Sequence, residues 1–171
     1  GFALLYPEQQ RANNPNLCFN WFVPEDTRRG GGEAQSIRSM IAAMVARHGV
    51  DPARAFVTGL SAGGAMAATL LAVYPEVFAG GAPIAGLPHG VATTVPEAFD
   101  RMRGEGTPPP RALQDILRRA SSHDGPWPRL SIWQGTADQT VVASNAEAIL
   151  GQWQAAHGVA GPPAHRAEAF N

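Results

Sequence analysis

The chain contains no lysine, because all 13 of its basic residues are arginine. This absence excludes a Ser-Lys catalytic dyad, a Schiff-base lysine and the phosphate-binding lysine of a Walker motif within the 171 residues. The formal net charge is only -1 and the arginines are scattered, so no basic patch for nucleic acid or for an anionic membrane is visible. We therefore expect no nucleic-acid partner.

Cysteine and long apolar runs are scarce as well. Cys18 is the only cysteine, which excludes an internal disulfide and a thiolate zinc cluster and favours a buried, small hydrophobic role for that side chain. No apolar stretch reaches the length of a membrane span, and residues 1–5 lack the basic region and cleavage pattern of a signal peptide. We expect no membrane span and no metal centre, and these residues do not encode a compartment.

The chain does contain enough apolar material for one sizeable core, with 44% hydrophobic and 16% charged residues, so we expect a single domain over 1–171. Apolar runs and apolar residues at helical spacing alternate along it. The expected strands cover 2–6, 55–58, 78–84 and 130–133, and the expected helices about 33–47, 64–73 and 145–157, the last with Ser144 and Glu147 as a capping box. This alternation predicts an α/β fold with a mostly parallel sheet and helices on both faces.

Residues 88–128 depart from the alternation. Proline and glycine cluster there, a run of three prolines breaks the chain, and only a modest helix around Leu113 and Leu117 is indicated. We interpret this segment as an insertion above the sheet.

The most informative motif is the pentapeptide Gly59-Leu60-Ser61-Ala62-Gly63, which follows an apolar strand-like run and opens a helix of small residues. A Gly-x-Ser-x-Gly nucleophile elbow needs this context, because its serine takes a strained backbone conformation that exposes the hydroxyl. Glycine at 59 and 63 removes side chains that we expect would collide with the neighbouring strand and helix. A serine that merely caps a helix after a glycine-rich turn is the alternative interpretation.

A serine hydroxyl becomes a good nucleophile when a histidine removes its proton and a carboxylate orients that histidine. In the order Ser, acid, His, the acid lies in the loop after a later strand, so that it reaches the same carboxyl edge of the sheet as the serine. Asp138 fits this position, because it lies in the loop 134–141 directly after the expected strand 130–133. A turn aspartate that caps its own loop is the alternative.

Several segments together resemble one family of α/β-hydrolases, the poly(3-hydroxybutyrate) depolymerases and feruloyl esterases. They are Gly59 to Met66, Tyr74-Pro75, Pro83 to Pro88, Trp133 to Asp138 with Val141, Leu5 to Glu8, Asn20 to Phe22 and Arg28 to Glu33. The similarity extends from about residue 2 to 153 and is far more specific than the pentapeptide, which many hydrolases share. It implies Ser61 as the nucleophile, Asp138 as the triad acid and the Ala62 backbone N–H as an oxyanion-hole donor, and it suggests a secreted protein.

The chain departs from that family pattern at both ends. The resemblance begins at the fourth strand of the family's sheet and stops before the eighth strand. A His-Gly-Cys segment, which would supply a second oxyanion donor and a cysteine able to pair with Cys18, is absent. A Gly-His-Ala-Trp type segment with the catalytic histidine is absent as well. We therefore expect a partial α/β-hydrolase domain that lacks the early strands and the last strand, an internal fragment of a longer esterase, nearly inert, with a gap in the sheet beside 55–58.

None of the five histidines stands out as the base. His48 and His157 each precede a glycine at a helix end, where capping is the favoured role, and His123 lies in the expected insertion. His165 follows the last expected helix with no strand between, which disfavours it. His89 follows an expected strand and could contact substrate near the mouth of the site.

The leading hypothesis is a serine carboxylesterase that needs no metal or organic cofactor and acts on a hydroxyalkanoate polymer, a feruloylated polysaccharide or a small acetyl ester. Trp21 is a candidate wall for an apolar or aromatic acyl group, as are Phe22 and Trp127, and core packing or surface exposure is the alternative role of each. The second hypothesis is a non-catalytic binding module that keeps the hydrolase scaffold. Labelling of Ser61 by a serine-directed phosphonate distinguishes the two.

Overall fold

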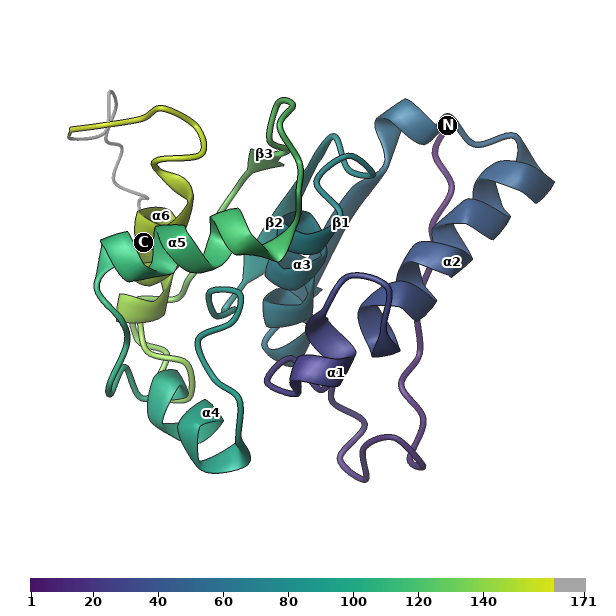
Figure 1. Cartoon of the computed structure of the whole chain (residues 1–171). Coiled ribbons are helices and arrows are strands. Elements are labelled where there is room, and N and C mark those ends of the chain that lie inside the picture. Colours follow the sequence, from purple (N-terminus) through teal and green to yellow (C-terminus); the bar gives the residue numbers. More distant parts are fainter. Residues whose placement is uncertain (162–171) are drawn as a thin grey trace.

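The computed structural model describes residues 1–161. In chain order the elements are α1 (Pro24–Thr27), α2 (Gly32–His48), a 3-10 turn (Pro52–Arg54), β1 (Phe56–Leu60), α3 (Ala62–Val73), β2 (Gly80–Ile84), α4 (Val95–Met102), α5 (Pro110–Ala120), β3 (Arg129–Leu130) and α6 (Ser144–Trp153). Figure 1 shows the strands in the middle of the molecule with α3 beside them, α2 at one end and α5 and α6 at the other.

The strands form one parallel sheet in the order β1-β2-β3. Leu60 is paired with Ile84 at the end of β1, and Ile84 forms an isolated parallel bridge with Trp133 beyond the end of β3. Backbone bonds from Ser131 to Gly81 and from Trp133 to Pro83 continue the pairing as far as 133. Parallel neighbours joined through helices confirm the α/β class that the sequence predicted.

α3 is the centre of the core, since every residue from Gly64 to Val73 is buried. Its side chains pack in one cluster with Ile37 of α2, Leu117 of α5 and Ile149 of α6. Leu113 and Leu117 are each only 1% exposed, so the segment 88–128 contributes to the core of the described part. Its interpretation as an insertion relative to the family stays a prediction.

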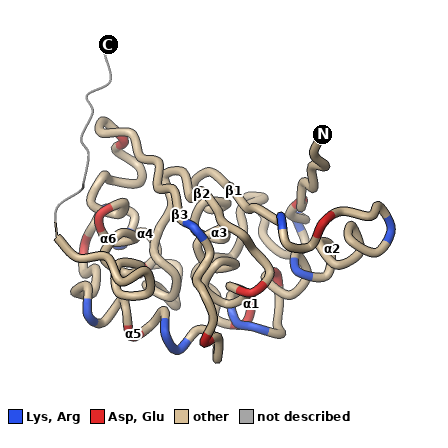
Figure 2. Tube along the Cα trace, turned by 90° about the horizontal axis from the view of Figure 1, so that it is seen from above, with Lys and Arg blue, Asp and Glu red and all other residues tan. Residues whose placement is uncertain are grey.

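The two faces of the sheet differ in what covers them. Val57, Gly81 and Leu130 are paired in register, and the face they share lies against the core, where a side chain at 81 would contact Leu71 of α3. The alternate residues point the other way and are exposed: Phe56 by 69%, Leu60 by 66%, Ile84 by 37% and Trp133 by 61%. Figure 2 shows α1, α3 and α5 to one side of the strands. The sequence predicted helices on both faces, and in the described residues helices cover one.

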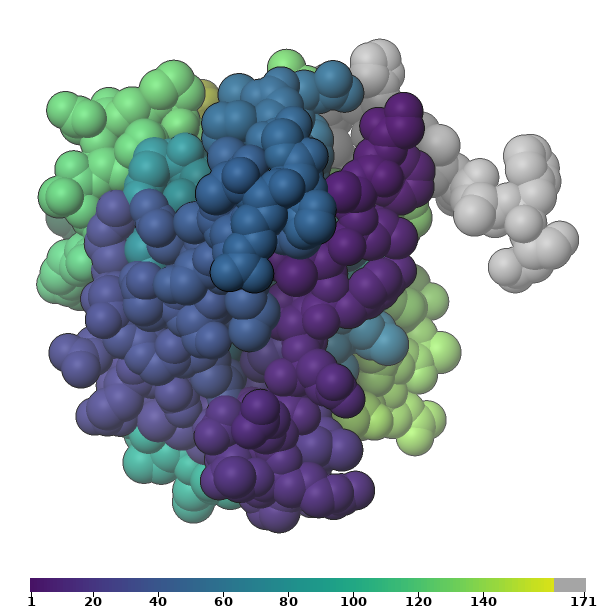
Figure 3. Space-filling view, turned by 90° about the vertical axis from the view of Figure 1, so that its right-hand side faces the viewer, coloured from purple at the N-terminus to yellow at the C-terminus, as the bar shows by residue number. Residues whose placement is uncertain are grey.

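Residues 2–6, expected to form a strand, are not in a strand and are exposed. They lie on the surface beside α2, as the purple atoms in Figure 3 show. A strand needs a neighbour for its backbone hydrogen bonds, and no residue among 1–161 pairs with this segment. The prediction is therefore wrong for this structure, whereas β1 at the edge of the sheet agrees with the expected gap beside 55–58.

Two further expectations are corrected. Ser144 is the first residue of α6 and not its cap; Ala143 precedes the helix and makes no side-chain capping bond, so the capping box with Glu147 does not form. Cys18 is exposed, not buried, because it lies in a polar surface loop with asparagines at 14 and 16. Within residues 1–161, none of the helices combines the length and the apolar character that crossing a membrane requires.

Candidate active site

Ser61 lies in the bend between β1 and α3. Its backbone has φ 56° and ψ −119°, a region that residues other than glycine rarely adopt and that costs about 1–3 kcal/mol. Hydrogen bonds hold it from both sides: its N–H donates to the Ile84 carbonyl at 2.9 Å, and its own carbonyl accepts from the Ala65 N–H at 2.9 Å. The structure therefore has the sharp strand-to-helix turn that the pentapeptide predicted, with the serine at its strained position.

The glycines that this turn requires are those at 59 and 64. A Cβ at position 59 would overlap the Gly63 carbonyl, and one at position 64 would lie 2.6 Å from the Ile84 carbonyl oxygen. A Cβ at position 63, by contrast, would meet no atom within 4 Å in the described part of the chain. The expected collision at Gly63 is thus wrong, because the helix turns this residue outward and brings its neighbour against β2.

Ala62 begins α3, so its N–H belongs to the first turn, where backbone donors have no partner inside the helix. The positive end of the helix dipole adds to this local potential. A negative charge that develops on an oxygen next to Ser61 would be stabilised there.

Asp138 lies in the loop that follows β3, and its carboxylate is held by three donors. Oδ1 accepts from the backbone N–H groups of Thr140 at 2.9 Å and Val141 at 3.0 Å, and Oδ2 accepts from Nε2 of Gln134 at 3.3 Å. The Val141 and Thr140 N–H groups are the main causes that hold the pKa of this carboxyl below its ordinary value, with a smaller contribution from Gln134. Asp138 is therefore ionised at neutral pH.

Backbone bonds join the elbow to the strand that precedes Asp138. Ser61 donates to Ile84, Ile84 is bridged to Trp133, and the N–H of Ala85 donates to the Trp133 carbonyl at 2.8 Å. Asp138 follows Trp133 by five positions. Since the carboxyl ends of parallel strands share one edge, Ser61 and the loop of Asp138 both emerge there.

Trp21 is 7% exposed and packs edge to face on Phe22, with ring centroids 5.5 Å apart. It belongs to a buried cluster that contains Ala65 of α3 and Val141, and Ala62 packs against that cluster. Trp21 thus packs in the same buried cluster as the first turn of α3, and its role as a substrate wall stays a prediction.

His89 points at α3 well beyond the elbow. Its Nδ1 is 3.2 Å from Oγ1 of Thr69, which lies eight residues, or about 12 Å of helix, from Ser61. The Gln152 side chain holds the backbone of His89 at both its N–H and its carbonyl. Burial lowers the pKa of His89 to about 4, so the ring is neutral at pH 7. Contact with substrate stays a prediction for His89, and His165 lies outside the described residues.

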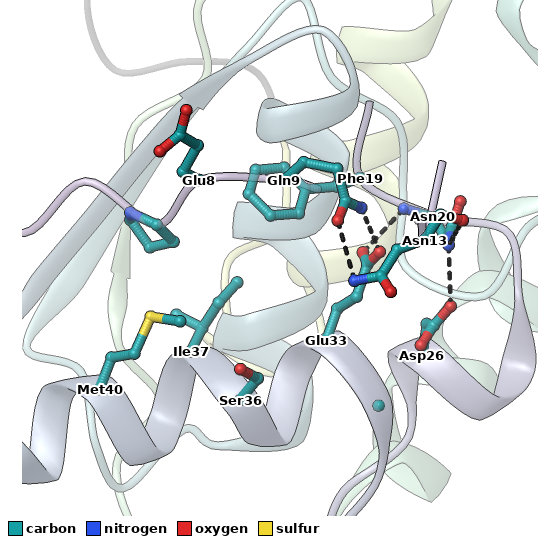
Figure 4. A pocket seen from close by; sticks show the side chains of 12 residues that line it. Glu8, Gln9, Asn13, Phe19, Asn20, Asp26, Glu33, Ser36, Ile37 and Met40 are labelled. Atoms are coloured by element: carbon teal, nitrogen blue, oxygen red, sulfur yellow. Dashed lines mark hydrogen bonds between the residues drawn. The ribbon is translucent and has the colours of Figure 1, made fainter. Parts of the chain in front are cut away.

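Residues 1–161 contain no group of three or more metal-ligating side chains. A cavity of about 430 Å³ lies between the N-terminal segment and α2, away from the elbow, and Figure 4 shows Glu33 in its wall. The Glu33 carboxylate accepts hydrogen bonds from the Gln9 side chain and from the Asn20 N–H, and burial is the main cause that raises its pKa.

Gln134 is the site residue that the sequence did not reveal. It lies between Trp133 and Gly135, but nothing in the sequence pattern indicates that its side chain turns back toward Asp138 and Val141.

Residues 1–169 match the family described as esterase PHB depolymerase. The chain belongs to this family. Among the relatives of this esterase-family chain, poly(3-hydroxyalkanoate) depolymerase C of Paucimonas lemoignei is 46% identical over 159 residues, which is 92% of this chain and 38% of that protein. Feruloyl esterase B of Talaromyces stipitatus is 29% identical, over 93% of this chain and 46% of its own length.

A solved structure, the acetyl xylan esterase from Aspergillus awamori, is similar with a TM-score of 0.77 at 26% identity. The match covers 82% of this chain and 54% of that one. The esterase-family chain therefore spans about half of the length of the relatives it matches, or less. The resemblance found in the sequence is confirmed, and so is the α/β-hydrolase fold.

Proposed function

We propose that the protein is a carboxylic ester hydrolase in which Ser61 is the nucleophile, Asp138 the triad acid and the Ala62 N–H an oxyanion donor. The observation that carries this proposal is the backbone of Ser61, with φ 56° and ψ −119° at the end of a parallel strand. A non-glycine residue persists in so strained a conformation where the surrounding structure compensates for it, and such residues cluster at active sites. Membership of an esterase family supports the same chemistry.

In this mechanism Oγ of Ser61 attacks the ester carbonyl carbon while its proton passes to a histidine. The carbonyl oxygen becomes an oxyanion beside the Ala62 N–H, and its collapse expels the alcohol, which takes the proton from the imidazolium. Water then attacks the acyl-serine by the same route and releases the acid. Asp138 orients the imidazole and stabilises its charged form.

We assign the histidine of this scheme to a part of the protein beyond this chain, since the matched relatives are about twice as long or longer. The described partners of the Asp138 carboxylate are Gln134, Thr140 and Val141. Loss of the histidine from a serine triad costs on the order of 10⁶-fold in turnover. The 171-residue chain by itself should therefore be nearly inert.

For the substrate, we propose a 3-hydroxyalkanoate ester. The relative named as a depolymerase of such esters is 46% identical, whereas the feruloyl esterase above is 29% identical. Release of 3-hydroxybutyrate from its polyester, compared with release of ferulate and of acetate from matched esters, tests this choice. Faster turnover of either of the other two esters would overturn it.

The test of the nucleophile uses the full-length product of the gene that encodes this chain, treated with a serine-directed fluorophosphonate. We expect one adduct, on the peptide that contains Ser61, and none in Ser61→Ala. Ser122→Ala is a matched control, because Ser122 is exposed in a loop after α5, away from the elbow. A folded but unreactive protein would instead favour the non-catalytic binding module.

A further inference from the structure

Gln134 uses both hydrogens of its side-chain amide inside one loop. Nε2 donates to the Val141 carbonyl at 2.7 Å and to Oδ2 of Asp138 at 3.3 Å. The residue comes directly after Trp133, where pairing with β2 ends, so the amide closes the loop 134–141 at its base. The side chain thus links the two ends of the loop to the carboxylate in its middle.

The two oxygens of Asp138 have different surroundings. Oδ1 is occupied by the N–H groups of Thr140 and Val141, which is the geometry of an aspartate that caps its own turn. Oδ2 receives only the Gln134 amide from the described residues. Each carboxylate oxygen has two lone pairs, so Oδ2 is the oxygen that can accept a further N–H.

The other end of the Gln134 link is anchored in the core. Val141 is 1% exposed and belongs to the same buried cluster as Ala65. Ala65 in turn donates its N–H to the Ser61 carbonyl at 2.9 Å. The Gln134 amide therefore ties Oδ2 to the carbonyl of a residue whose side chain is buried in the same cluster as the first turn of α3.

We propose that Gln134 is the positioning residue of the triad acid. Its amide bridges Oδ2 of Asp138 and the Val141 carbonyl, and this bridge fixes the direction in which Oδ2 accepts an imidazole N–H. The inference rests on the proposed role of Asp138. A purely structural role, in which Gln134 only closes the loop through Val141, would leave the titration of Asp138 unchanged when Gln134 is replaced.

The primary experiment follows the Asp138 carboxyl carbon by NMR during a pH titration of the full-length protein. In Gln134→Leu we expect the pKa of Asp138 to rise, because a donor to its charged form is lost. Gln134→Glu should raise it further, since a second carboxylate replaces the donor. Gln139→Leu is the matched control, because Gln139 is an exposed glutamine of the same loop. An unchanged Asp138 titration in both Gln134 variants, or an equal shift in the control, overturns the proposal.

If the variants do not fold, the contact between Gln134 and Asp138 can still be tested on the unmodified protein. The side-chain amide signals of Gln134 should shift with the titration midpoint of Asp138, and those of Gln139 should not. Amide signals of Gln134 that ignore this midpoint would contradict the proposal.

Activity of the full-length protein then separates this inference from the proposed function. Gln134→Leu should lower kcat/KM about tenfold, the effect of one lost hydrogen bond to a charged group. In a background that carries Asp138→Asn, the same replacement should change kcat/KM by a factor near one, because its effect passes through the carboxylate. Full activity of Asp138→Asn would refute the triad assignment and with it the catalytic meaning of the Gln134 contact, whereas an unchanged NMR titration would refute the contact of Gln134 with Asp138 while leaving the triad assignment in place.

Discussion

The backbone N–H of Ser61 donates to the carbonyl oxygen of Ile84 at 2.9 Å. This bond extends the pairing of β1 with β2 by one residue, so the chain bends into α3 while it is still tied to the neighbouring strand. Since Ile84 is bridged to Trp133, the same backbone network reaches the strand that leads to Asp138. The position of the elbow therefore depends on close backbone contacts between the sheet and the first turn of α3.

Gly64→Ala should disturb this arrangement and Gly63→Ala should not. A methyl group at 64 would lie 2.6 Å from the Ile84 oxygen, so we expect a loss of about 1–3 kcal/mol in the free energy of unfolding, typical of overpacking. At 63 the methyl group meets open space, and alanine should be neutral or stabilising by up to about 1 kcal/mol through its helix propensity. Urea denaturation of both variants measures the difference. Equal losses in the two would contradict the contact described here.

His89 should make stability depend on pH between its two pKa values. Its pKa falls from 6.5 to about 4 on burial, so the folded state binds fewer protons than the unfolded state in that interval. The contribution of the neutral ring is complete above pH 6.5 and is lost as the pH falls through about 4, with at most about 3 kcal/mol at stake. Urea midpoints at several pH values, compared with His89→Gln, measure it. His48→Gln, at the exposed end of α2, should follow the unmodified chain.

Glu33 should affect the pH dependence of stability in the opposite direction to His89. Burial is the main cause that raises its pKa above the ordinary 4.5, against hydrogen bonds from Gln9 and Asn20. The protonated form therefore favours folding, and this contribution is present below pH 4.5 and disappears as the pH rises through the raised value. The stability of the unmodified chain should fall relative to Glu33→Gln over that interval. Glu25→Gln, an exposed replacement on α1, serves as the charge control, and a pH-independent difference for Glu33→Gln would refute the prediction.

The uncovered face of the sheet should cause the isolated chain to self-associate. Phe56 and Leu60 are about two-thirds exposed, so Phe56→Thr with Leu60→Thr should reduce association at little cost in stability, because threonine keeps the strand propensity. Light scattering after gel filtration measures the association. Leu71→Thr on the opposite, buried side should instead destabilise by about 2–5 kcal/mol. Association that is unchanged by the double replacement would exclude this face as its cause.

Elements whose signal is local were predictable. The apolar spacing predicted a helix over 33–47, and α2 covers Gly32–His48, where Gly49 ends it in the left-handed conformation. The helix after the elbow was predicted as well, because small and apolar residues continue without interruption to Tyr74-Pro75. Residues 2–6 look like a strand by the same criteria and are not one, since strand formation depends on a partner that apolarity does not specify.

The elbow could be predicted from local sequence, because strand, serine, glycine and helix follow one another within a few residues and act through short-range sterics. It also placed an aspartate after a later strand. Three features could not be predicted in this way: Gly64 and not Gly63 packs against β2, Gln134 contacts both Asp138 and Val141, and one face of the sheet is exposed. These features depend on contacts between residues that are distant in the chain or on the direction of a single side chain. Neither long-range contacts nor the direction of one side chain can be recognised from the spacing of apolar residues in a sequence.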